Sequence, residues 1–172
     1  MIGVELQIRI AYETAEMLEQ LKAIYQKQSD INFTKGEVLS KAIMATYDQW
    51  GETEWDKVLS LPVKIDQSDE VSAGALRPKF QIANDIEAKI TELKESIRLG
   101  VGANFVKNGA AVKFVLRLAL YTLQNDRVVS VESVISDTLD HFVEAEEHPE
   151  TKATLQKFAA EVVNQLELND LL

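Results

Sequence analysis

The feature of this sequence that most constrains its fold is a pattern that occurs twice, 72 residues apart. Residues 4–11 read VELQIRIA, and residues 76–83 read LRPKFQIA. In both stretches apolar residues alternate with polar ones, which predicts a short strand with one buried face. A unit too small to bury its own apolar face commonly buries it against a second copy. We therefore expect the two copies to pack together.

Two helical patterns follow each strand. In the first copy an apolar stripe runs from residue 17 to residue 25, and Thr34 with Glu37 forms a capping box that starts the second helix. In the second copy Asn84 is well placed to cap the first helix. The second helix of that copy matches only after a one-residue insertion near Asn108. Each copy thus predicts the order strand, helix, helix.

The net charge of −10 is distributed unevenly along the chain. The region of the second copy carries +4, whereas the last 44 residues carry −8. These last residues form two further helical patterns, the first capped by Ser130 and the second with Pro149 in its first turn. Such asymmetry is typical of a chain that separates a binding face from a solubilising or partner-binding part. We expect four segments: unit 1 at 1–50, a linker at 51–75, unit 2 at 76–128 and an acidic helical segment at 129–172.

Several classes of protein are disfavoured by what the sequence lacks. It has no cysteine, which excludes disulfides and thiolate metal sites. Glu5 and Arg9 interrupt the first apolar residues, and no apolar run has the length of a membrane span, so we expect a cytoplasmic protein without membrane contact. His141 and His148 lack the spacing of a metal pair and are expected to be surface residues. We expect no enzyme, no cofactor and no metal.

The order strand, helix, helix, with three polar positions on each strand, resembles the ribbon-helix-helix family of Arc- and MetJ-type DNA-binding proteins. The resemblance covers residues 1–50 and 76–123 and implies a tandem form, in which one chain supplies both units. It implies a mostly α protein with a short two-stranded antiparallel ribbon, a pseudo-dimer followed by C-terminal helices. In that family the ribbon enters the major groove of double-stranded DNA, a groove that admits a two-stranded ribbon.

The resemblance also implies which residues contact DNA. Base contacts are expected from the outward strand positions, and phosphate contacts from the starts of the second helices, where backbone N–H groups and the helix dipole favour anions. The base-contacting set is Glu5, Gln7, Arg9, Arg77, Lys79 and Gln81, and the phosphate-contacting set is Thr34, Lys35, Gly36, Lys107, Asn108 and Gly109. Pro78 departs from the pattern, because it removes a donor from the ribbon. If Pro78 faces the partner strand, pairing begins after it, and the reach of Arg77 into the groove is in question.

We expect a sequence-specific DNA-binding protein that acts as a transcriptional repressor or in plasmid partition or conjugative transfer. One strand offers Glu-Gln-Arg and the other Arg-Lys-Gln, so each chain should read an asymmetric element. The alternative is a protein–protein scaffold with a degenerate form of the same fold, which the net charge of −10 favours. The acidic C-terminal helices either support the body or join a second chain or another protein.

Overall fold

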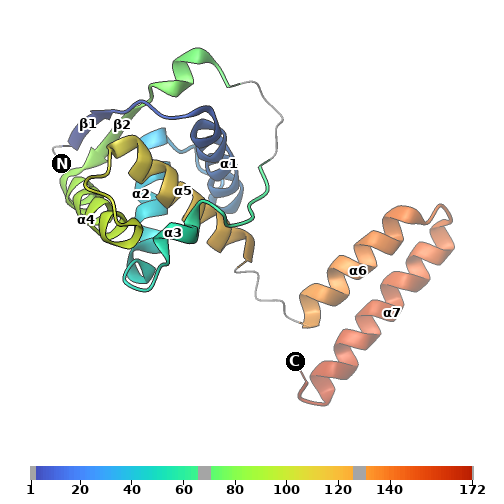
Figure 1. Cartoon of the computed structure of the whole chain (residues 1–172). Coiled ribbons are helices and arrows are strands. Elements are labelled where there is room, and N and C mark those ends of the chain that lie inside the picture. Colours follow the sequence, from blue (N-terminus) through green and yellow to red (C-terminus); the bar gives the residue numbers. More distant parts are fainter. Residues whose placement is uncertain (1–2, 66–70, 126–130, 172) are drawn as a thin grey trace. The chain divides into compact units, whose positions relative to one another are not determined.

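The computed structural model describes residues 3–65, 71–125 and 131–171, and the chain divides into two compact units between residues 126 and 127. Figure 1 shows the elements of each unit. The first unit contains β1 (Gly3–Gln7), α1 (Tyr12–Ser29), α2 (Lys35–Thr46), α3 (Trp55–Val58), β2 (Lys79–Ala83), α4 (Asn84–Val101) and α5 (Asn108–Asn125), with 3₁₀ turns at Tyr47–Gln49 and Ala73–Leu76. The second unit contains α6 (Val131–Ala145) and α7 (Pro149–Leu168). The predicted fold class, mostly α with a two-stranded antiparallel ribbon, is confirmed.

The two strands of the repeated pattern pair with each other. β1 and β2 run antiparallel, with Glu5 opposite Gln81 and Gln7 opposite Lys79. The inward face of the ribbon is apolar, and Phe80 on that face is completely buried. Side chains alternate between the two faces of a strand, so the same register directs the polar residues outward.

Each second helix begins against the ribbon segment of the other copy, either β2 or the residues that follow β1. A Cβ atom on Gly36, at the start of α2, would overlap the backbone of Gln81 in β2. A Cβ atom on Gly109, at the start of α5, would lie 2.5 Å from the carbonyl oxygen of Arg9. Positions 9 and 81 are 72 residues apart, and positions 36 and 109 are 73 apart, which matches the predicted one-residue insertion. Glycine is required at both places because the helix start touches strand backbone.

The first helices of the two copies end in the same way. The residue after α1 is Asp30, with φ 54°, and its backbone N–H donates to the carbonyl oxygen of Gln26. The residue after α4 is Gly102, with φ 68°, and its N–H donates to the carbonyl oxygen of Arg98. Both pairs are related by the 72-residue offset, so the repeat extends to backbone conformation. A left-handed residue at this position satisfies a helix-end carbonyl group, and glycine adopts it with the least strain.

The helix-capping predictions have mixed outcomes. The capping box at Thr34 is confirmed, since its hydroxyl accepts from the Glu37 N–H and the Glu37 carboxylate accepts from the Thr34 N–H. Pro149 stands at the start of α7, as predicted. The prediction that Asn84 caps α4 is wrong: the cap position is Ala83, in extended conformation and without a side-chain bond. β2 leads directly into α4, so Asn84 is already helical. Ser130 lies outside the described residues.

The described part of the linker is held against the body. Trp55 in α3 is buried, and its indole N–H donates to the Ser96 hydroxyl at 3.0 Å. Further along, the carbonyl oxygen of Leu61 accepts two bonds from the Arg117 guanidinium, the shorter at 2.7 Å. The backbone of Lys64 exchanges two hydrogen bonds with the Gln124 side-chain amide. This segment therefore runs along α5 instead of crossing solvent.

The two copies share one hydrophobic core. Its buried members include residues of α1 to α5, Phe80 and Ile82 of β2, and Ile8 and Ile10 just after β1. Within this core α2 contacts α1, α4 and α5. The second unit is different, because Ala159 is its one buried apolar side chain among the described residues. The conformation of the first unit is thus maintained by its own core.

Candidate nucleic-acid interface

The outward face of the ribbon presents four exposed polar side chains from the paired strands. Glu5 and Gln7 come from β1, and Lys79 and Gln81 come from β2. All four belong to the set predicted to contact bases, and the structure brings them together on one surface. Arg and Lys suit the acceptors of guanine, and Gln suits adenine, in the major groove.

Glu5 connects the two strands across this face. Its carboxylate accepts a 2.6 Å hydrogen bond from the Gln81 side-chain amide and lies 3.4 Å from the Lys79 ammonium group. Both partners come from the second copy, so the acid of one copy engages two polar side chains of the other. Exposed contacts of this kind contribute about 0–1 kcal/mol each, so DNA could displace them at small cost. Gln7 has no such partner within the described chain.

The ribbon has an irregular, positively charged end. The N–H of Ile8 donates to the carbonyl oxygen of Pro78 at 3.3 Å, and the N–H of Ile10 donates to Leu76 at 2.9 Å. The backbone of Pro78 therefore faces the partner strand, and β2 begins one residue later. Continued in the same register, Arg9 and Arg77 lie opposite each other, and both are exposed. Two facing guanidinium groups repel, which favours an anion between them.

The predicted phosphate site of the first copy is already capped. Thr34 uses its hydroxyl and its N–H for the capping box, at 3.2 Å and 2.7 Å. The hydrogen bond from the Thr34 backbone holds the pKa of Glu37 below its ordinary value, so this carboxylate stays ionised next to the helix start. Gly36 is buried against β2, and Lys35 is half-buried. A phosphate at α2 must therefore compete with the Glu37 carboxylate.

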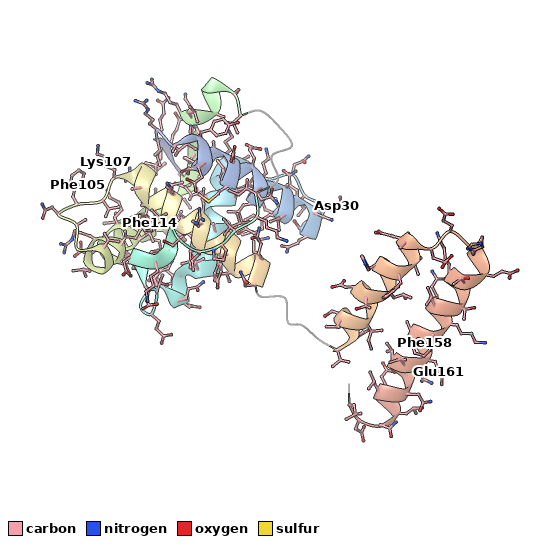
Figure 2. The ribbon with its side chains drawn as sticks, turned by 45° about the vertical axis from the view of Figure 1, so that its right-hand side comes forward. Asp30, Phe105, Lys107, Phe114, Phe158 and Glu161 are labelled. Carbon is pink, nitrogen blue, oxygen red and sulfur yellow. The ribbon has the colours of Figure 1, made fainter. Side chains whose placement is uncertain are left out.

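The corresponding site of the second copy is more open. The first turn of α5 has no acidic residue. Phe105 and Lys107 lie at the periphery of the body, on the loop before α5 (Figure 2). Asn108 and Gly109 are half-buried at the helix start, and Gly109 contacts the backbone of Arg9. The structure thus brings predicted base and phosphate contacts of opposite copies together at this end of the ribbon.

A cavity of about 570 Å³ adjoins this open helix start, and no sequence motif predicted it. Arg9, Lys107 and Gly109 line it, together with two residues that were not predicted to belong to a site, Thr14 and Lys113. The one available sign was the repeat itself, because Thr14 stands where the second copy has an apolar residue.

The α6–α7 hairpin carries an apolar groove of about 360 Å³ between its helices. Phe142 and Phe158 line it and are 57% and 69% exposed. His148 pairs with Glu146 at 2.9 Å. No group of three potential metal-binding side chains occurs within the described residues. None of the described helices is long and apolar enough to cross a membrane.

Comparison of this chain with models of protein families, with curated proteins and with solved structures finds no match. The assignment of its surfaces therefore depends on the geometry and chemistry described above.

Proposed function

We propose that this protein binds double-stranded DNA sequence-specifically by inserting the β1–β2 ribbon into the major groove, as ribbon-helix-helix proteins do. The observation that carries the proposal is the outward face of the ribbon. It is narrow, polar and flanked by the starts of α2 and α5, which contact the backbone of Gln81 in β2 and of Arg9 just after β1. A two-stranded ribbon fits the major groove, and helix starts suit the phosphates along its edges.

The charge of this surface supports the proposal despite the acidity of the whole chain. Arg9, Arg77 and Lys79 contribute three positive charges to the outward face, against one negative charge from Glu5. Most of the acidic excess lies in the last 44 residues, outside the ribbon unit. A strand can read base edges only after the protein has bound the neighbouring phosphates. The positive charge of the ribbon therefore matters more than the total charge of the chain.

The biological setting that fits is a cytoplasmic repressor or a DNA-processing accessory protein of a plasmid or other mobile element. An asymmetric ribbon suits a non-palindromic element read by one chain, since the two strands offer different side chains. The apolar groove of the α6–α7 hairpin supports a second candidate, a protein-interaction scaffold, because exposed apolar surfaces of this kind mark contact sites. In a DNA-binding protein the same hairpin would join a second chain or another protein.

A salt series tests the proposal. Binding to a mixed-sequence duplex, followed by fluorescence anisotropy between about 50 and 200 mM KCl, should weaken by roughly tenfold or more as phosphate contacts release counterions. A scaffold would show no binding at any of these concentrations.

A double variant tests the reading face itself. Gln7→Ala with Arg9→Ala should abolish preference for a selected site while leaving the circular dichroism spectrum unchanged, because both side chains are exposed. Lys27→Ala is the matched control, since it removes an exposed cation in the last turn of α1. Equal site preference in the double variant and in the wild type would show that the ribbon does not read bases.

A further inference from the structure

The cavity of about 570 Å³ next to α5 has the composition of a ligand site. Its walls are largely apolar and include Ile97 and Val101 from the end of α4, and Phe114 from α5. Its polar groups lie on the side of the ribbon and of the α5 start, where Arg9 and Lys107 line it. An apolar chamber with a few convergent polar groups is the usual form of a small-molecule site.

One polar group in the wall has no partner. The hydroxyl oxygen of Thr14 is buried and makes no hydrogen bond within the described protein, and the residue is 1% exposed. An unpaired buried hydroxyl costs about 1–3 kcal/mol, so a group that satisfies it gains a corresponding advantage. Thr14 lines the cavity, so a ligand inside can accept a hydrogen bond from this hydroxyl.

The internal repeat provides a comparison for this cavity. In the first copy, the residues at the positions of Ile97 and Phe105 are Tyr25 and Phe33. The rings of Tyr25 and Phe33 lie 6.2 Å apart, with the ammonium group of Lys41 over both. In the second copy a smaller isoleucine replaces the tyrosine, and Phe105 is 68% exposed. The second copy thus lacks the aromatic pair that the first copy has at this place.

The two copies also differ at the position of the unpaired hydroxyl. The residue 72 positions after Thr14 is Ile86, which is buried and apolar. The second-copy cavity therefore has a hydroxyl where the first-copy equivalent has a hydrocarbon side chain. It also has Arg9 where the first-copy equivalent has Gln81. Both exchanges make the open cavity more suitable for an anionic group.

The electrostatics of the cavity favour a negative charge. Gly109 and Ala110, in the first turn of the 18-residue helix α5, line it, and the dipole of that helix start attracts anions. Arg9 and Lys107 form no ion pair with any described residue. Lys113 is paired with Glu13 at 3.3 Å, and Arg117 holds the same carboxylate at 2.7 Å. The Glu13 carboxylate is thereby neutralised, while Arg9 and Lys107 remain available.

We propose that this cavity binds a small amphipathic carboxylate, with its carboxylate at Arg9, Lys107 and the α5 start and its hydrocarbon body against Ile97 and Val101. The Thr14 hydroxyl donates to the bound ligand. A regulatory role follows if the proposed function holds. The ligand occupies Arg9 and Lys107, so the protein with bound ligand should bind DNA more weakly. DNA that loses the contacts of Arg9 and Lys107 to the ligand binds more weakly, and the coupling is reciprocal.

The direct test uses sodium octanoate and the full chain without DNA. Amide resonances in ¹H–¹⁵N spectra should shift at Gly109 and Ala110, and not at Gly36, as octanoate is added to roughly 10 mM, a range that covers millimolar dissociation constants. Octanol, which lacks the charge, should bind about tenfold more weakly. Shifts confined to the α6–α7 groove, or no shifts at all, would overturn the proposal.

Substitutions at Thr14 locate the ligand. Thr14→Ile reproduces the residue of the other copy, fills part of the cavity and removes the hydroxyl, so octanoate affinity should fall about tenfold or more. Thr14→Ser keeps the hydroxyl and should bind octanoate within about threefold of the wild type. Unchanged affinity in Thr14→Ile would refute the site. Since the isoleucine variant loses an unpaired buried group, its melting temperature should not fall, which separates lost binding from misfolding.

A final arm separates the two proposals. On a DNA site selected by the wild type, saturating octanoate should lower DNA affinity about tenfold. If octanoate binds at Gly109 but DNA affinity is unchanged, the regulatory inference is wrong. If the protein binds no DNA while octanoate still shifts the Gly109 resonance, the proposed function fails and the ligand site stands.

Discussion

Replacing Gly109 by alanine tests whether each helix start is locked against the strand of the other copy. A Cβ atom at this position would lie 2.5 Å from the carbonyl oxygen of Arg9, whereas ordinary contacts begin at 3.4 Å. The start of α5 must therefore move away from the strand by roughly 0.9 Å. Overpacking of this kind costs about 1–3 kcal/mol. Alanine otherwise favours a helix over glycine by up to about 1 kcal/mol, so the sign of the effect depends on the contact.

The assay is thermal unfolding followed by circular dichroism. Less the gain in helix propensity, the net loss is up to about 3 kcal/mol. With a change of roughly 4 °C per kcal/mol, Gly109→Ala should therefore lower the melting temperature by up to about 12 °C. Gly36→Ala should lower it further, since its Cβ atom would overlap the backbone of Gln81. Gly51→Ala is the control, because no atom of the described residues lies within 4 Å of its Cβ position. If Gly109→Ala melts at or above the temperature of Gly51→Ala, the interlocked arrangement of the two copies is wrong.

Three further predictions concern stability. Asp30 adopts the left-handed conformation, with φ 54°, where the other copy has Gly102. Asp30→Gly should therefore raise the free energy of unfolding, measured by urea denaturation, by about 1 kcal/mol, and Gly102→Asp should lower it by a similar amount. Burial raises the pKa of Tyr25 to about 12. The protonated phenol therefore contributes up to about 3 kcal/mol to the free energy of unfolding below pH 10, and this contribution is lost between pH 10 and 12. Tyr25→Phe should not show this loss. A chain ending at residue 126 should melt within about 3 °C of the full chain, because the core belongs to the first unit, and a large drop in melting temperature would contradict this. Without the acidic segment the same chain should bind nonspecific DNA more tightly.

The fold class could be predicted because its signals are local and repeated. Alternation at residues 4–11 and 76–83 and the helical stripes fixed the order of elements, and Thr34 with Glu37 fixed one helix start. The error at Asn84 also has a local cause. Ala11 and Ala83 occupy the same cap position in the two copies, with φ −73° and −74°, and neither has a side-chain bond. The match between the two copies indicates a helix start at Ala83, whereas capping propensity alone favours Asn84.

The details of the candidate interface could not be predicted because they depend on pairing between distant residues. The contacts of Glu5 with Gln81 and Lys79 follow from a register that the alternation alone does not determine. The close approach of Gly36 and Gly109 to the strands gives these glycines a packing role, whereas the sequence suggested an approach to phosphate. Their phosphate contacts stay a prediction. The unpaired hydroxyl of Thr14 is visible only once α1 and the start of α5 are in place.

The central claim is that one chain reads an asymmetric DNA element with two different strands. Selection of duplexes from a random library by the full protein, followed by sequencing, tests it most directly. We expect one enriched motif that lacks inverted symmetry within the span of a single ribbon and that is lost for the Gln7→Ala, Arg9→Ala variant. Enrichment of a perfect inverted repeat bound by one chain would contradict the asymmetric reading. Failure to enrich any sequence would contradict DNA recognition by the ribbon.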